Sequence, residues 1–179
     1  MNKIKLVFLA LVSGILLSGC GGLTSTPQSS FDANSDIAAI QDAVKVFQDL
    51  TDSAHSDDSV ENMVRVASLN SSALDGIEES TNKLLGHIDE NWDSIGSGDS
   101  PDGISREVLK EWGEAYLFWI TYQRKIQAIA EECLANLETF STCRSQKLGQ
   151  IMELERQSTQ PLIVVQAKIQ AWQEKYANQ

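Results

Sequence analysis

The segment ISREVLKEWGEAYLFWITYQRKIQAIAEECLANLETFSTC, residues 104–143, decides the fold of this chain. Its apolar residues recur every three or four positions, which is the spacing of one face of an α-helix. Leu109, Tyr116 and Ile120 widen that face, so we expect other helices to contact it from two sides. The main row of the face runs through Ile104, Val108, Trp112, Ala115, Trp119, Tyr122, Ile126, Ile129, Cys133 and Leu137.

Two cysteines flank the point at which this segment is expected to reverse. Cys133 and Cys143 are nearly equidistant from a turn around Glu138 and Thr139, which would place them on facing sides of an antiparallel helical hairpin. We predict a disulfide that stabilises the fold by roughly 2 to 3 kcal/mol. A redox-active pair is the alternative, but active thiols usually lie closer in sequence and beside a cationic group.

The remaining apolar residues have the same helical spacing, and strand-like alternation is absent. We expect a short helix over about residues 35–53 and one long helix from about residue 57 to Ile95. The Gly, Ser, Asp and Pro residues of 96–103 predict a loop. A last helix over about 143–176 should be kinked or split by Pro161, which lacks an N–H. The fold class is therefore all-α, an antiparallel bundle of about four helices, three long and one short.

The N-terminus has the features of a secretion signal. Lys3 and Lys5 precede an apolar run over residues 6–17 that is too short to be a permanent membrane span. The next residues, Leu17-Ser18-Gly19-Cys20, resemble the lipobox of bacterial lipoproteins. The resemblance implies cleavage after residue 19 and lipid attachment to Cys20.

The residues after Cys20 fit a lipoprotein with a tethered body. Residues 20–34 are rich in Gly, Ser, Thr and Pro, as expected of a flexible tether, and residues 35–179 would form a single helical domain. The resemblance further implies a protein of the bacterial cell envelope, held at the membrane by its lipid. In a Gram-negative host, Gly21 after the lipidated cysteine favours the periplasmic face of the outer membrane.

The charge of the chain is strongly acidic and unevenly distributed. Without Lys3 and Lys5, the 14 basic residues become 12 against 25 acidic ones, a net charge of about −13. Residues 20–103 hold 16 acidic and three basic residues, whereas residues 104–179 hold nine of each. Nucleic acid is therefore not an expected partner.

Few residues offer catalytic chemistry. His55 and His87 are the only histidines, and no nucleophile with a base, phosphate-binding glycine loop or zinc-type cysteine set accompanies them. We therefore predict neither an enzyme nor a bound cofactor. A covalent haem motif is absent, and His87 as a haem ligand would need an opposing Met or His and a roomy core.

Two acidic segments have residues that could bind a metal ion. The acidic residues and the histidine around the turn between the first two expected helices could suit a divalent cation, but they are also typical of helix caps and a solvated turn. They are Asp49, Asp52, His55, Asp57 and Asp58. The segment from Asp89 begins like a calcium loop, then has Ser94 where glycine is needed and Ser100 where the bidentate Glu belongs. We predict no metal at either segment.

Aromatic residues gather in one half of the expected bundle. The short first helix should cover only the half near residues 57–77, and every Trp falls in the other half. These side chains either fill a three-helix core or form a docking surface for a protein or ligand. The candidate binding residues are Trp92, Trp112, Tyr116, Leu117, Trp119 and Trp172.

The sequence thus favours a non-enzymatic interaction or accessory protein of the cell envelope, for example a pilotin-like helper. It would dock another envelope protein through the aromatic half of its bundle. The alternative is a small-ligand or metal-binding periplasmic module that uses the aromatic half or the acidic turn.

Overall fold

The computed structural model describes residues 33–56, 59–96, 104–136 and 138–176. The expected signal peptide, Cys20, most of the expected tether and residues 97–103 of the expected loop lie outside these residues. Across the described ranges the chain is all-helical, with four helices and no strand. The helices are α2 (Ala33–Ser56), α3 (Val60–Glu90), α4 (Arg106–Leu134) and α5 (Phe140–Tyr176).

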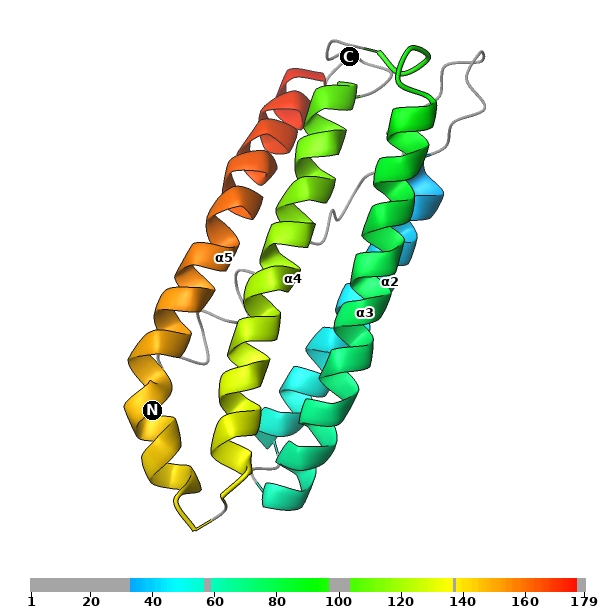
Figure 1. Cartoon of the computed structure of the whole chain (residues 1–179). Helices are drawn as coiled ribbons and strands as arrows, with labels where there is room; N and C mark the ends of the chain where they lie inside the picture. The colour runs from blue at the N-terminus through cyan, green and yellow to red at the C-terminus, as the bar shows by residue number, and fades with distance from the viewer. Residues whose placement is uncertain (1–32, 57–58, 97–103, 137, 177–179) are drawn as a thin grey trace.

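The four helices form an antiparallel bundle, as the apolar spacing predicts. Helices α3, α4 and α5 lie side by side in chain order, and α2 lies behind α3 (Figure 1). The rings of Phe47 on α2 and Trp119 on α4 meet edge to face, with centroids 5.4 Å apart, so α2 also contacts α4. Helix α4 is therefore in contact with the other three helices, in agreement with its wide apolar face.

Serine hydroxyls define the first turns of the two central helices. Ser59 Oγ accepts a hydrogen bond from the Asn62 backbone N–H, and Ser105 Oγ accepts one from the Val108 N–H. Such caps satisfy N–H groups that have no partner within the helix. Between the same helices, a Cβ on Gly113 would lie 2.7 Å from a Leu85 side-chain carbon. The absence of a side chain at Gly113 thus lets α3 and α4 approach closely.

The disulfide prediction is confirmed. Cys133 in the last turn of α4 is bonded to Cys143 in the first turn of α5, with Cα atoms 5.5 Å apart. The bond closes the α4–α5 hairpin, and Glu132 forms an ion pair with Lys147 close to it. The first turn of α5 is therefore held to the last turn of α4 by a covalent link.

The structure narrows one expectation about the helices and overturns another. Of the two expected effects of Pro161, a kink or a split, the split is excluded, because α5 continues from Phe140 to Tyr176 with the proline inside it. The half of the bundle that holds the tryptophans is not left uncovered by α2. The Asp36 carboxylate of α2 lies 2.5 Å from Nδ1 of His87, which is in the last turn of α3. Helix α2 therefore extends along α3 as far as His87, beyond the expected limit near residue 77.

The main core contains apolar side chains from all four helices. From α5 it includes only Leu162, Val165 and Ile169, all in the C-terminal half of that helix. No residue of 140–157 belongs to this core or is among the half-buried apolar residues that contact it. Helix α5 thus has a C-terminal half inside the core and an N-terminal half outside it.

Candidate functional site

Three of the predicted binding residues are core residues. Trp112, Tyr116 and Trp119 are 3%, 5% and 3% exposed, respectively. Their rings meet edge to face along α4, with centroids 4.7 Å apart for the first pair and 6.3 Å for the second. Burial raises the pKa of the Tyr116 hydroxyl far above its usual value. These three side chains fill the core, which is the first of the two roles that the sequence left open.

The other three predicted binding residues, Trp92, Leu117 and Trp172, are half-buried and contact the edge of the core. The Arg106 guanidinium lies over the Trp92 ring, 4.5 Å from its centroid. Arg106 also donates a hydrogen bond to the Trp92 backbone carbonyl. Trp92 is therefore fixed by the start of α4 and is not free to meet a partner.

Leu117 is less exposed than its position in the sequence indicates, because α3 lies on that side of α4. Lys110 and Arg124, each seven residues from Leu117, share its helix face. Lys110 forms an ion pair with Asp89 of α3, and Arg124 forms ion pairs with Asp75 and Glu78 of α3. These pairs place the Leu117 face against α3.

The exposed aromatic residue of α4 is instead Phe118, which the sequence reasoning missed. Its side chain is 40% exposed, and its ring centroid lies 4.7 Å from that of the half-buried Tyr122. Lys125 Nζ lies 4.2 Å from the centroid of the Tyr122 ring, on which it forms a cation–π contact. The sequence does contain an indication that Phe118 is exposed. Phe118 lies on the same helix face as the charged residues Glu111 and Lys125, each of which is seven residues away.

Helix α5 carries an exposed apolar residue, Val164, on the helix face that pairs with α4. Lys168 of α5 is paired with Glu111 of α4, which fixes the register of the two helices. Phe118 lies seven residues after Glu111, and Pro161 lies seven residues before Lys168. Because the two helices are antiparallel, Phe118 and Pro161 lie at the same level. Val164, which shares the helix face of Lys168 and Pro161, is 55% exposed. We call Phe118, Tyr122 and Val164 the seam patch, since they follow the outer seam between α4 and α5.

A buried carboxylate joins the start of α2 to the end of α3. Asp36 is only 3% exposed, and its two carboxylate oxygens face two side chains of α3, His87 and Lys83. One oxygen lies 2.5 Å from His87 Nδ1, and the other lies 3.3 Å from Lys83 Nζ. His87 has no hydrogen bond to a Ser, Thr or Cys side chain of the described residues. These contacts form a clasp between the start of α2 and the end of α3.

The described ranges contain no group of three or more His, Cys, Asp or Glu side chains that could hold a metal ion. Asp49 of the acidic turn forms an ion pair with Lys45 of its own helix. Asp57, Asp58 and the side chain of His55 lie outside what the structure describes. His87, which the sequence raised as a haem ligand, is held by Asp36.

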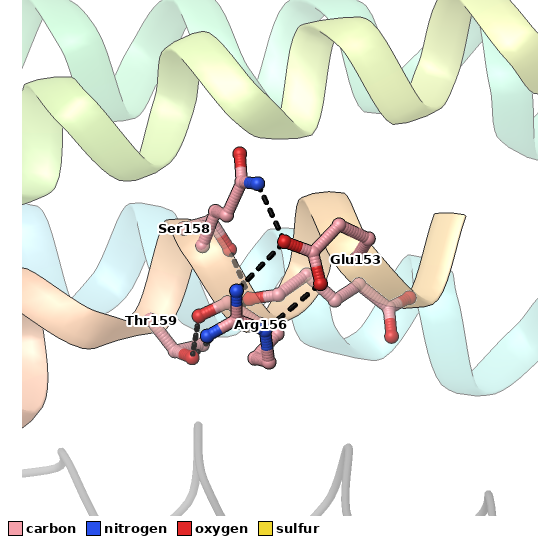
Figure 2. A network of polar contacts seen from close by, with 6 residues as sticks. Glu153, Arg156, Ser158 and Thr159 are labelled. Carbon is pink, nitrogen blue, oxygen red and sulfur yellow. Dashed lines mark hydrogen bonds and ion pairs between the residues drawn. The ribbon is translucent and has the colours of Figure 1, made fainter. Parts of the chain in front are cut away.

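Polar side chains are concentrated on α5 just before Pro161. Arg156 donates two hydrogen bonds to the Glu153 carboxylate, of 2.8 Å and 2.7 Å (Figure 2). The hydroxyls of Ser158 and Thr159 donate to backbone carbonyls of the preceding turn, including that of Glu155. The Glu155 carboxyl is half-buried and has no ion pair or hydrogen bond to another described residue.

Glu155 makes the stability of the protein pH-dependent. Burial raises the pKa of its carboxyl from 4.5 to about 7, so the folded state favours the neutral form. Stability should fall as the pH rises from about 4.5 to 7, because the unfolded chain ionises first. We expect Glu155→Gln to raise the free energy of unfolding by about 1–2 kcal/mol at pH 8, after allowance for solvent screening, and to leave it unchanged at pH 4. Urea titrations at the two pH values measure this.

Glu153→Gln is the matched control, because Glu153 lies two residues from Glu155 and the expected change in stability at pH 8 has the opposite sign. Hydrogen bonds from Arg156 and Gln157 lower the pKa of Glu153 to about 2. The ionised Glu153 carboxylate stabilises the folded protein above about pH 4.5, and this stabilisation is lost as the pH falls towards 2. The Glu153→Gln variant should therefore be less stable than the wild type at pH 8. An equal effect of the two substitutions at pH 8 would contradict the assignment of Glu155.

No protein-family model, curated protein or solved structure matches this chain. Among the described residues, no helix combines the length and the apolar character that crossing a bilayer requires.

Proposed function

We propose that this chain is a non-enzymatic interaction protein of a bacterial cell envelope, tethered to the membrane by a lipid on Cys20. Its helical body would dock another envelope protein through the seam patch. The support for the tether is the lipobox resemblance at residues 17–20 together with the flexible composition of the residues that follow. A flexible tether keeps the body near the membrane and raises its effective concentration for a partner there.

One observation carries the docking proposal, namely the ring pair of the exposed Phe118 and the half-buried Tyr122, with the exposed Val164 on the adjoining face of α5. Single exposed apolar residues are common on soluble proteins and need no explanation. A cluster with two aromatic rings is different, because aromatic residues are enriched at protein interfaces and bury a large area at a small entropic cost. The docking surface thus moves from the buried aromatic row of α4 to its outer side.

Photo-crosslinking in cells tests the docking surface. We would place a photoreactive amino acid at Val164 and compare the wild-type background with Phe118→Ala. We expect one envelope protein to be captured in the wild type and at least a tenfold loss of capture in Phe118→Ala. Leu69→Ala on α3 is the matched control, since Leu69 is 41% exposed and Phe118 is 40% exposed. Equal capture in both variants would refute the seam patch as the docking surface.

The lipid anchor has its own test. Cells are grown with a clickable palmitate analogue, and the membrane fraction is compared for the wild type and Cys20→Ala. We expect label on the wild type only, because Cys20 is the residue that the lipobox assigns to lipidation. A label that persists in Cys20→Ala would overturn the anchor without affecting the docking proposal.

A further inference from the structure

The N-terminal half of α5 differs from every other part of the described bundle. We call residues 140–157 the α5 arm. Not one of its side chains is buried, whereas Ser158, Leu162, Val165 and Ile169 in the rest of α5 are. Leu148 and Met152 of the arm are 40% and 49% exposed, respectively. Segments with so few buried apolar contacts belong to the low end of local stability in a folded protein.

The start of the arm is also poorly suited to begin a helix. The first turn of α5 has no acidic residue, and Arg144 follows it at the positive end of the helix dipole. The Thr139 hydroxyl, which precedes the helix, donates to the Asn136 carbonyl instead of capping an N–H of α5. Local sequence therefore contributes little to holding the first turn of the arm in place.

Among the described residues, one covalent bond and one ion pair link the arm to α4. The bond is Cys133–Cys143, and the ion pair joins Lys147 Nζ to a Glu132 oxygen at 3.0 Å. Exposed ion pairs contribute about 0–1 kcal/mol. The arm's other ion pair, Glu153 with Arg156, is internal to it and would survive its separation from α4 (Figure 2). Since the apolar side chains of Ile151 and Leu154 are only half-buried, the disulfide is the strongest single link between the arm and α4.

Pro161 gives the arm a natural boundary. It has no N–H, so the Gln157 carbonyl at the end of the arm loses its helical partner. Just beyond the arm, Ser158 is fully buried and Thr159 bonds back to the carbonyls of Glu155 and Arg156. The helix is thus weakened at the point where burial begins.

We propose that the Cys133–Cys143 bond is a redox latch that holds the α5 arm on α4, with the helix before Pro161 as its hinge. Reduction by a dithiol would release residues 140–157 as a unit and leave the rest of the bundle folded. This inference is independent of the proposed function, since it concerns neither the lipid anchor nor the seam patch.

The chemistry of the latch is thiol–disulfide exchange. A thiolate of the dithiol attacks Sγ of Cys143, which is half-buried, while Cys133 is only 4% exposed. The Sγ–Sγ bond breaks, and Cys133 leaves as a thiolate that takes up a proton. The second thiol of the reductant, as a thiolate, then attacks the mixed disulfide and frees Cys143. Two electrons pass to the protein, and the reductant leaves as its own disulfide.

Hydrogen exchange read by mass spectrometry tests the latch on the full chain. We would compare the oxidised protein with the same protein reduced by dithiothreitol. Amides of residues 144–157 should exchange at least tenfold faster after reduction, because an isolated helix of this length is marginal in water. Amides of residues 162–176 and of α2, α3 and α4 should change less than twofold.

The variant Cys133→Ala/Cys143→Ala removes the bond without a reductant and should show the same pattern of exchange. Unchanged protection of the arm after reduction would mean that packing against α4 holds it, which overturns the proposal. A uniform increase in all helices would also overturn it, because the bond would then support the whole bundle. If the variant does not fold, reduction of the folded wild type still decides between these outcomes.

Discussion

Replacing Trp119 with alanine is expected to lower the free energy of unfolding by about 3–5 kcal/mol, the usual cost of removing a buried tryptophan. Trp119 is 3% exposed and lies between the rings of Phe47 on α2 and Tyr116 on its own helix. Its loss would leave a cavity where α2 meets α4. Domains of this size are stable by about 5–15 kcal/mol, so the variant should be close to the limit of folding.

Urea unfolding followed by far-ultraviolet circular dichroism measures this effect without relying on the fluorescence of the residue removed. Phe118→Ala is the control, one position further on and 40% exposed, and should cost no more than about 0.5–1 kcal/mol. If Trp119→Ala does not fold, Trp119→Phe takes its place. It keeps a ring at the same position and should lose less stability, so its unfolding can still be measured. Equal costs for Trp119→Ala and Phe118→Ala would contradict the assignment of Trp119 to the core.

Removing His87 should have the second large effect, because it leaves a buried carboxylate without its closest partner. Asp36 is 3% exposed, and the His87→Ala variant would leave it only Lys83, at 3.3 Å. Leaving a buried polar group without its hydrogen-bond partner costs about 1–3 kcal/mol, and more when the group is charged. We expect His87→Ala to cost about 2–3 kcal/mol at neutral pH, because the exposed Lys83 ammonium still offsets part of the Asp36 charge.

A double-mutant cycle separates this explanation from a simple loss of packing. Asp36→Asn in the His87→Ala background removes the unpaired charge and should recover at least half of the lost stability. Lys83→Ala is the matched control on the same helix and should cost at most about 1 kcal/mol, since the Lys83 side chain is 61% exposed. If Asp36→Asn recovers nothing, the clasp is not electrostatic.

The spacing of apolar residues was sufficient to predict the helices and their antiparallel order. The disulfide was also predictable, because Cys133 and Cys143 flank one turn and therefore face each other once both helices form. How far α2 extends along the bundle was not predictable from the sequence. Asp36 looks in sequence like an acidic residue in a solvated first turn, and its burial depends on partners about 50 residues away. Periodicity carries no information about such contacts.

The exposed side of α4 was not predictable from the sequence for a related reason. Leu117 and Phe118 differ by one helical step, and the sequence does not say on which side of α4 the acidic helix α3 lies. The pairs of Lys110 and Arg124 with α3 settle that side and cover Leu117. Pro161 was expected to kink or split α5, but the chain beyond it is anchored by core residues, so one lost hydrogen bond does not end the helix.

The position of the four tryptophans determines which probe can observe each part of this molecule. They are Trp92, Trp112, Trp119 and Trp172, and none lies between Phe140 and Gln157. Intrinsic fluorescence will therefore report the core and remain silent when only that stretch unravels, while circular dichroism will lose about a seventh of its helical signal. Under reducing conditions the two melting curves should separate, with dichroism falling first, whereas in the oxidised protein they should coincide.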